Sequence, residues 1–294
     1  MQVKFMSCWE LPLEKILSWS RIFMAVQQLD EQMLSSVLQE VEKCAYKAGE
    51  ILLSYHDQAG LVRSYKSDGS FATQADLASE KYLIEALRPL VTGAGFYAEE
   101  SGLQEGNEYA WVIDPLDGTT NFSHGLPYFC VSIALTYCQQ PVLGVIYQPT
   151  TQELFSVQRG CGSFLKRETL SKKLSVSQEP ELKKSMIVMC AEDVAEILRG
   201  LDEQFLPGEW PYIRDYGAGA LDIAYCAAGR FDGCFYEGTK WWDIAAGSLL
   251  LEEAGGRFST IQGGQIGAED SSFIGANGLI FNELSQMVRK TVGV

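Results

Sequence analysis

Two carboxylates lie three residues apart at the end of an apolar run. Asp114 and Asp117 follow Trp111–Ile113, and Pro115 fixes its own φ while biasing Asp114 toward an extended conformation. The turn can therefore direct both carboxylates and the Leu116 carbonyl toward one point. Hard oxygen ligands of this kind suit Mg²⁺. A D-x-x-D pair alone is most often a solvated turn, so the prediction of a metal site depends on the longer string around it.

The residues that follow this turn favour anion binding. Gly118 permits a close approach of the backbone, and Thr119 and Thr120 are expected to start a short helix. The free amides of such a start form a cradle for an anion. We therefore expect Asp117, Gly118, Thr119 and Thr120 to make up a phosphate-binding turn beside the metal ligands.

Two further acidic positions belong to the same hypothesis. Glu99 lies in a Glu-Glu-Ser string one short connection before the first motif. Asp243 precedes the apolar stretch Ile244–Ala254 and is predicted to be the N-cap of that helix. Alone, each has an ordinary explanation, exposed surface for Glu99 and helix capping for Asp243. Taken with Asp114, they predict a cluster of carboxylates.

Apolar spacing predicts the elements that position these residues. From Leu34 onward apolar residues recur every three or four positions, which predicts a helix with Ser36 and Gln39 as its capping box. A second helix is predicted over Ala75–Arg88, ended by Pro89. Short β-type runs follow and imply a largely antiparallel sheet: Ala110–Ile113, Phe129–Tyr137, Val142–Tyr147 and Leu154–Val157.

After about residue 180 the pattern alternates between strand and helix, which predicts an α/β lobe. The expected elements are the strands Met186–Cys190 and Phe231–Tyr236 and the helices Asp193–Leu201, Ala218–Ala228 and Ile244–Ala254. The chain is thus expected to have three parts. These are an extension over residues 1–33, an α+β lobe over 34–175 that carries Glu99 and Asp114–Phe122, and an α/β lobe over 176–294 that carries Trp242 and Asp243.

Composition narrows the class of partner. The formal net charge of −15 repels nucleic acid and anionic membranes, so generic nucleic-acid binding is not expected. No apolar run reaches the roughly 18 residues that a membrane span needs, and the first 33 residues hold no run of signal-peptide length. We therefore expect no membrane association and a cytoplasmic location. The eight cysteines are spread singly and predict reduced thiols.

Two longer strings resemble the signature motifs of a known family. D-P-L-D-G-T-T-N-F at Asp114–Phe122 and W-D-I-A-A-G at Trp242–Gly247 resemble those of the inositol monophosphatase family, and Glu99–Ser101 resembles its acidic element. The resemblance covers residues 34–294 and implies an α/β (α+β) fold, a layered αβαβα sandwich. It also implies a Mg²⁺-dependent hydrolase with two or three ions, inhibition by Li⁺ and a homodimer.

Carried over residue by residue, the resemblance implies two metal sites that share a ligand. One ion would bind Glu99, Asp114 and the Leu116 carbonyl, and a second would bind Asp114, Asp117 and Asp243. The chemistry implied is in-line attack of a water molecule on the phosphorus.

The catalytic residues implied in this way are Glu99, Thr119 and Asp76. Thr119 would orient the attacking water, and Asp76 would hold Thr119 by a hydrogen bond. On sequence alone, a first-turn helix charge explains Asp76 equally well. Lys66 resembles the lysine of a loop that closes near the metals, and an ordinary surface lysine explains it equally well.

The sequence departs from the family where the alcohol part of the substrate binds. The family's substrate-hydroxyl glutamate falls on Tyr236, and Glu237 is one residue later. Since a one-residue shift turns a strand residue to the other face, Glu237 is expected at the site only if the strand is bulged. The hydroxyl found in the family's Gly-Ser-Ala or Gly-Thr-Ala string is missing at Ala218.

The function expected from the resemblance is hydrolysis of a small phosphorylated polyol or related monoester, with inositol 1-phosphate first. The alternatives are 3′-phosphoadenosine phosphate, fructose 1,6-bisphosphate, NADP and histidinol phosphate. Thr120 weighs against the nucleotidase branch, which tends to carry Lys or Arg there. An alternative of another class is a regulatory, protein-binding member of the same fold.

Overall fold

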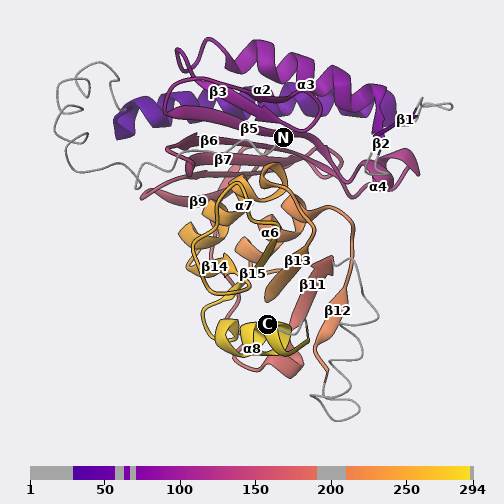
Figure 1. Ribbon diagram of the computed structural model, residues 1–294, viewed down its shortest axis with the longest axis vertical. Helices are drawn as coiled ribbons and strands as arrows, with labels where there is room; N and C mark the ends of the chain where they lie inside the picture. The colour runs from indigo at the N-terminus through magenta and orange to yellow at the C-terminus, as the bar shows by residue number, and fades with distance from the viewer. Residues whose placement is uncertain (1–28, 57–62, 67–70, 191–209, 292–294) are drawn as a thin grey trace.

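The computed structural model describes residues 29–56, 63–66, 71–190 and 210–291 and arranges them in five layers (Figure 1). Two long helices cover one face of an eight-stranded sheet, two further helices lie between that sheet and a five-stranded sheet, and a last helix covers the outer face of the second sheet. This order confirms the αβαβα sandwich that was expected.

The first helix, α2 (Glu31–His56), packs a stripe of apolar side chains on the eight-stranded sheet. It begins three residues earlier than predicted and inside the expected extension. The Asp30 carboxylate accepts a hydrogen bond from the Met33 amide at 2.8 Å, which caps the helix start. Ser36 lies inside the helix and donates to the Gln32 carbonyl, so the predicted capping box at Ser36 is wrong.

The second helix of this layer, α3 (Gln74–Leu87), matches its prediction within one residue at each end. Thr73 is its N-cap, and Asp76 accepts from the Thr73 amide at 2.8 Å. The cap lies directly after the two-stranded ribbon of β1 (Arg63–Tyr65) and β2 (Phe71–Thr73). A buried carboxylate is therefore fixed at the entrance of α3, on the side of the acidic motif.

The eight-stranded sheet has the order β10-β9-β8-β7-β6-β5-β3-β4, and only the β3–β5 pairing is parallel. The predicted, largely antiparallel sheet is thereby confirmed. Its strands are β3 (Gly95–Ala98), β4 (Gly102–Gln104), β5 (Tyr109–Asp117), β6 (Cys130–Tyr137), β7 (Gln140–Gln148), β8 (Glu153–Gln158), β9 (Gly162–Arg167) and β10 (Leu170–Lys173).

The five-stranded sheet has the order β12-β11-β13-β15-β14 and mixes parallel with antiparallel pairs. Its strands are β11 (Met186–Cys190), β12 (Tyr212–Arg214), β13 (Gly233–Glu237), β14 (Gly256–Thr260) and β15 (Ser272–Asn277). The remaining elements are the 3₁₀ turn η1 (Leu182–Lys184) and the helices α6 (Gly219–Ala227), α7 (Trp241–Glu253) and α8 (Phe281–Thr291). The predicted helix over Asp193–Leu201 lies outside the described residues.

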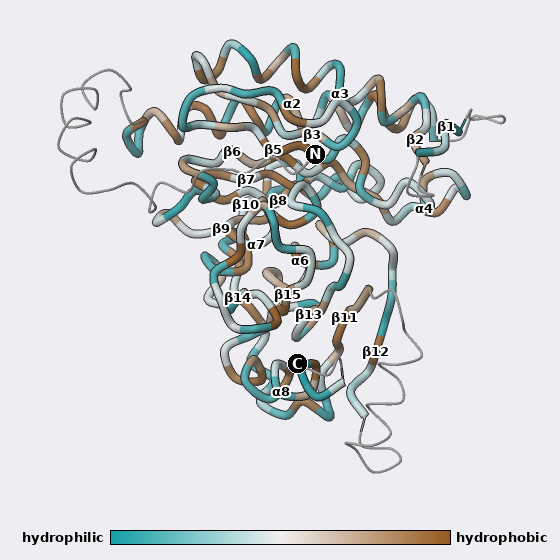
Figure 2. The backbone as a smooth tube through the Cα atoms, in the orientation of Figure 1, coloured by the Kyte–Doolittle hydropathy of each residue, from teal (hydrophilic) through white to brown (hydrophobic). Residues whose placement is uncertain are grey.

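Close contacts at glycines bring α7 against the first sheet. A Cβ at Gly144 of β7 would lie 3.0 Å from the Ala246 backbone, and one at Gly247 would lie 2.9 Å from Ile223 of α6. The apolar colouring of these elements runs through the middle of the molecule in Figure 2. Because of this tight packing, the first turn of α7 lies beside β6, where the Ser132 hydroxyl donates to the Trp242 carbonyl.

The chain passes from the first sheet to the second between Lys173, where β10 ends, and Met186, where β11 begins. The division into lobes at residues 175 and 176 stays a prediction, since the α6 and α7 layer contacts both sheets. Within the described ranges, no helix combines the length and apolar character that a bilayer crossing would require.

Candidate active site

The acidic turn lies where β5 leaves its regular pairing with β6. The register shifts between Asp114 and Asp117, next to Pro115, which has no amide to donate. The Asp114 carboxylate, buried to 2% exposure, accepts from the Leu116 amide at 2.9 Å. The bulge therefore holds both carboxylates within β5, which continues to Asp117, so the prediction of a turn after a strand that ends at Ile113 is wrong.

Gly118 links this turn to a short helix, α4 (Thr119–Ser123). Its φ is 89°, and a Cβ there would lie 3.0 Å from the Tyr128 carbonyl and 3.1 Å from the Ala218 side chain. Only glycine fits both restrictions. The amides of Gly118, Thr119 and Thr120 donate to no acceptor among the residues that the structure describes. They are the amides that the sequence assigned to a phosphate.

Asp117 is held by the beginning of α6. Its carboxylate accepts from the Ala220 amide at 2.7 Å and from the Gly219 amide at 3.2 Å, and the Cys130 thiol lies 3.6 Å away. Burial raises the pKa of Asp117 to about 6, although the amides of Ala220 and Leu221 and the thiol act in the opposite direction. The side chain is thus fixed from the opposite layer of the sandwich.

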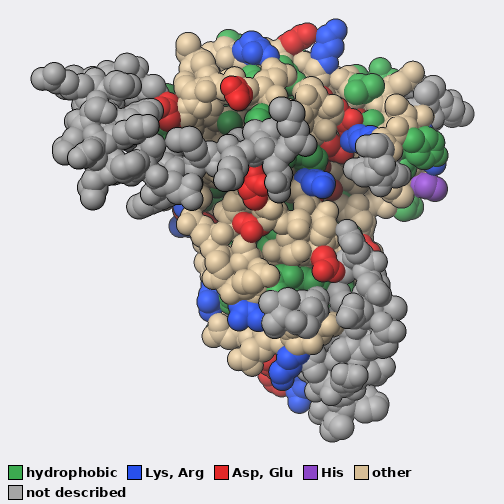
Figure 3. Space-filling view, viewed as in Figure 1, with side chains coloured by type: hydrophobic (Ala, Val, Ile, Leu, Met, Phe, Trp, Pro, Cys, Tyr) green, Lys and Arg blue, Asp and Glu red, His purple; other side chains and the backbone are tan. Residues whose placement is uncertain are grey.

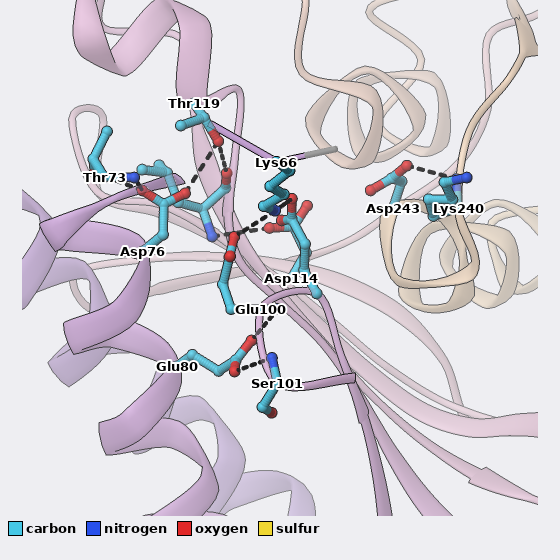
Figure 4. Close-up of polar contacts among 12 residues, drawn as sticks. Lys66, Thr73, Asp76, Glu80, Glu100, Ser101, Asp114, Thr119, Lys240 and Asp243 are labelled. Atoms are coloured by element: carbon cyan, nitrogen blue, oxygen red, sulfur yellow. Dashed lines mark hydrogen bonds and ion pairs between the residues drawn. The ribbon is translucent and has the colours of Figure 1, made fainter. Parts of the chain in front are cut away.

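Asp243 reaches the site from the first turn of α7 (Figure 4), but it is not the N-cap that was predicted. Lys240 holds the cap position, and Asp243, three residues later, accepts from the Lys240 amide at 2.8 Å. The helix begins at Trp241, since Trp241 and Trp242 form part of its first turn. Burial and the Asp117 charge raise the pKa of Asp243 to about 7, while the hydrogen bond from the Lys240 amide lowers it. Besides burial, the charges of Asp117 and Asp243 raise the pKa of Asp114, and the sharing of an ion between Asp114 and Asp243 stays a prediction.

Glu99 follows β3 and is paired with Lys66. The Lys66 ammonium lies 2.7 Å from Glu99 and 2.8 Å from Glu100. Burial raises the pKa of Glu99 to about 7 against the opposing effect of Lys66. Burial lowers the pKa of Lys66, but the hydrogen bonds to Glu100 and Glu99 raise it above its ordinary value. The lysine that sequence alone left undecided is thus part of the acidic centre.

The Thr119 hydroxyl lies 3.1 Å from the Asp76 carboxylate and 3.0 Å from the Leu116 carbonyl (Figure 4). The hydrogen bond implied between Asp76 and Thr119 is therefore present. Burial raises the pKa of Asp76, while the hydrogen bonds from Thr73 lower it. Asp76 thus links the cap of α3 to the hydroxyl beside the acidic turn.

Glu80 is a positioning residue that the sequence reasoning missed. Its carboxylate accepts from the amides of Glu100 and Ser101, each at 2.8 Å, and so holds the loop that carries Glu99. Glu80 lies one helical turn after Asp76, on the same face of α3. This spacing of two acids on a buried face was the signal available in the sequence.

Asp222 is a second residue that was missed. It is a buried carboxylate in α6 that accepts from the Tyr128 hydroxyl at 2.5 Å, while the nearby Tyr236 hydroxyl donates to the Gly219 carbonyl at 3.5 Å. Burial raises its pKa well above the ordinary value, with the two phenols acting against this. A single acid within the apolar string Ala-Leu-Asp-Ile was the available signal.

The strand that carries Tyr236 is regular. Tyr236 pairs with Phe273 and Glu237 with Ser272, without a register shift. Tyr236 is 1% exposed and points toward α6, so the half-buried Glu237 is directed to the other face of the strand. The bulge that would bring Glu237 to the site is absent from β13.

The acidic centre has the donor chemistry of a Mg²⁺ site. Burial raises the pKa of Asp114 well above its ordinary value, and repulsion from its neighbours adds to this: Glu99, Asp117 and Asp243. All of these ligand atoms are hard oxygens, and divalent cations would remove the repulsion. Within the described part of the chain, no three His, Cys, Asp or Glu side chains stand in the geometry of a formed metal site. The individual ligand assignments therefore stay predictions.

Comparison with known proteins agrees with this geometry. The model of the inositol monophosphatase family matches residues 33–292. An inositol-1-monophosphatase of Mesorhizobium japonicum is 38% identical over 265 aligned positions, and the match covers 87% of this chain and 97% of that protein. A Nus factor SuhB of Xylella fastidiosa is 34% identical over 84% of this chain and 92% of its own length. The crystal structure of the extragenic suppressor protein suhB from Bartonella henselae superposes with a TM-score of 0.79 at 35% identity, covering 87% and 99% of the two chains.

Proposed function

This chain belongs to the inositol monophosphatase family and is a phosphatase, and we propose that it hydrolyses a small phosphate monoester with the help of Mg²⁺. The observation that supports the proposal is the mutual repulsion of buried carboxylates from β5, the end of β3 and α7, beside amides at the start of α4 that have no acceptor within the described residues.

The residues proposed to hold the ions are those that the sequence assigned. Glu99, Asp114 and the Leu116 carbonyl would hold one ion, and Asp114, Asp117 and Asp243 a second. When bound, the ions supply Lewis-acid activation of water and charge stabilisation on the leaving oxygen.

The chain's own groups would orient the reactants. The Thr119 hydroxyl, held by Asp76, would position the attacking water. The amides of Gly118, Thr119 and Thr120 would bind the phosphoryl oxygens. Asp117 is fixed by α6 and would keep its place when substrate enters.

We propose inositol 1-phosphate as the first substrate to test. The names of the relatives support it, whereas the departure at Tyr236 and Glu237 weighs against it, because Tyr236 is buried against α6 and β13 has no bulge that would turn Glu237 to the same side. The alternatives named from the sequence therefore belong in the same assay: 3′-phosphoadenosine phosphate, fructose 1,6-bisphosphate, NADP and histidinol phosphate.

The test is release of inorganic phosphate from this panel, with Mg²⁺ and with a chelator. We expect activity only with Mg²⁺, inhibition by Li⁺, and the highest kcat/KM for a phosphorylated polyol. Phosphate release from every substrate in the presence of chelator would exclude the metal-dependent reaction.

Variants of the acidic centre test the ligands directly. Asp114→Asn and Asp243→Asn should each lower kcat by more than about hundredfold while the protein stays folded. Glu85→Gln, an exposed acid on α3, is the matched control and should retain full activity. Retained Mg²⁺-dependent turnover in Asp114→Asn would disprove its role as the shared ligand.

A second candidate is a regulatory, protein-binding role, favoured by relatives that carry the name Nus factor SuhB. This role predicts that Asp114→Asn still binds its protein partner, although it no longer hydrolyses a phosphate monoester. We also propose a homodimer, which the family resemblance implies, and the cytoplasmic location that was expected from the sequence. Analytical ultracentrifugation tests the dimer.

A further inference from the structure

A polar cavity lies at the far end of α7, away from the acidic centre. Its volume is about 650 Å³, it is open to solvent on one side, and it is lined by the last turn of α7, strand β14 with the turn after it, and one face of α8. Asp243 and Glu252 lie nine residues apart on α7, which is about 13.5 Å at the rise of an α-helix. A ligand in this cavity would not touch the groups assigned to the reaction.

One side of the cavity is formed by Arg257 of β14. Its guanidinium lies 4.1 Å from the centre of the Phe281 ring, and one terminal nitrogen donates to the Asn282 side chain at 2.9 Å. These contacts orient the plane of the group. A guanidinium has five N–H donors, so most of those on Arg257 stay free of any contact within the described residues.

Another side is formed by Arg289 of α8. Its Nε donates to the Ile261 carbonyl at 2.6 Å, which holds the side chain against the turn after β14. Gly263 in that turn has a φ of 91°, and a Cβ there would lie 2.9 Å from a terminal nitrogen of Arg289. The glycine therefore leaves room for the guanidinium, whose two terminal NH₂ groups remain available.

The other groups around the cavity also favour an acceptor-rich ligand. Asn282 uses its carbonyl oxygen for Arg257, which leaves its NH₂ donors available, and Gln286 adds an exposed amide. The single carboxylate in the lining, Glu252, has Arg159 3.9 Å away as a partner outside the cavity.

The charge of this region is opposite to that of the chain. The cavity lining holds two arginines and one acid, in a protein whose net charge is −15. On the face drawn in Figure 3, basic side chains gather toward the end of the molecule where α8 lies. Two oriented guanidinium groups suit oxyanions, which they bind through paired N–H donors.

We propose that this cavity is a binding site for a compact, multiply charged oxyanion, separate from the active site. Its volume is that of a small-molecule site, and its lining provides donors rather than apolar surface. Phosphoryl and carboxylate groups share the chemistry that both arginines recognise. Titration with one probe of each kind therefore distinguishes the two classes of ligand.

The test is isothermal titration calorimetry with inorganic pyrophosphate and, separately, citrate, on the full chain in the presence of a chelator. Without divalent ions the acidic centre repels both probes. We expect at least one of them to bind, and Arg257→Gln and Arg289→Gln each to weaken that binding by about tenfold or more. The probe that binds identifies a phosphoryl or a carboxylate ligand.

Lys172→Gln on the exposed strand β10 is the matched control, because it removes one positive charge elsewhere. It should leave the affinity within about twofold. Arg289→Lys keeps the positive charge but loses the paired N–H donors of the guanidinium, so its affinity for the anion should lie between those of the wild type and Arg289→Gln. Equal affinities in wild type, both glutamine variants and the control would overturn the site, and so would no binding of either probe up to about 10 mM.

Binding of the anion at this cavity is independent of the proposed function. Asp243→Asn should bind the same anion as the wild-type chain does, whether or not it hydrolyses a phosphate monoester.

Discussion

Asp114 and Asp222 are both buried acids whose pKa burial raises, yet their partners differ. Asp222 accepts from the Tyr128 phenol at 2.5 Å, so a neutral donor of the protein itself partners it, and the Tyr236 phenol also acts to lower its pKa. Asp114 has one N–H donor, from Leu116. Its other neighbours are carboxylates.

The difference separates a structural acid from a functional one. A buried carboxylate that the protein supplies with donors needs nothing from outside, whereas one surrounded by like charges is relieved by a cation or a proton. Burial alone does not distinguish the two environments, and the partners do. The comparison predicts that metal and pH act on Asp114 and its neighbours, whereas removal of a side chain does most damage at Asp222.

The largest expected effect is the pH dependence of the metal-free protein. The pKa values of Glu99 and Asp243 are raised to about 7 and that of Asp117 to about 6, from ordinary values of 4.5 and 3.8. The folded state therefore binds more protons than the unfolded state across this window. The stability that protonation of these three groups contributes is fully present below about pH 4 and is lost as the pH rises through 7. We expect the free energy of unfolding to fall by at least about 3 kcal/mol over that range.

Urea unfolding at several pH values, with chelator and with Mg²⁺, measures this loss. Mg²⁺ binds the deprotonated carboxylates, so its stabilising effect should grow as the pH rises. The difference between the two conditions isolates the acidic centre from the other acids of the chain. If the stabilisation by Mg²⁺ stayed constant between about pH 5 and 8, the raised pKa values of these carboxylates would be contradicted.

The second largest effect is expected at the satisfied acid. Asp222→Ala leaves the Tyr128 phenol without its acceptor and should lower the free energy of unfolding by about 2 kcal/mol. Denaturant titration in the presence of Mg²⁺ measures it. Asp215→Ala, an exposed acid that accepts from the Gly217 amide, is the control and should lose less than about 1 kcal/mol. Equal losses in the two variants would remove the distinction between Asp114 and Asp222.

The sequence predicted local features of the site well. Pro115 and the two flanking acids predicted a break in the regular strand, and the structure has it as a bulge within β5 rather than as a turn after the strand. Gly118 indicated a close backbone approach and adopts a φ of 89°. These features depend on the conformational limits of proline and glycine, which are properties of single residues.

Contacts between distant segments were harder to predict. Asp243 was predicted to be an N-cap because an acid directly before an apolar run often caps a helix. In the structure the two preceding tryptophans belong to the helix, which therefore begins at Trp241. The pairing of Tyr128 with Asp222 joins residues 94 positions apart. No local pattern encodes such a partner, since it depends on how α6 packs against the first sheet.

A smaller effect is expected from removing one charge of the acidic centre. Asparagine at position 114 keeps the oxygen that accepts from the Leu116 amide and relieves the repulsion with Asp117 and Asp243. In the metal-free protein at about pH 8, Asp114→Asn should raise the free energy of unfolding by about 1 to 2 kcal/mol. At about pH 5.5 the gain should shrink, because the wild-type cluster is then partly protonated. A destabilised Asp114→Asn at pH 8 would mean that Asp114 is a satisfied acid like Asp222.

The smallest effect is expected at Cys130, whose thiol lies 3.6 Å from Asp117. A thiol is a weak donor, and the Ala220 amide at 2.7 Å already fixes the same carboxylate oxygen. Cys130→Ala should therefore change the Mg²⁺ concentration for half-maximal activity by less than about threefold, and Cys130→Ser by less still, since its hydroxyl can donate to Asp117. A shift of tenfold or more in Cys130→Ala that Cys130→Ser reverses would show that Asp117 depends on this thiol. The acidic centre would then be held by neutral donors of the protein to the same degree as Asp222.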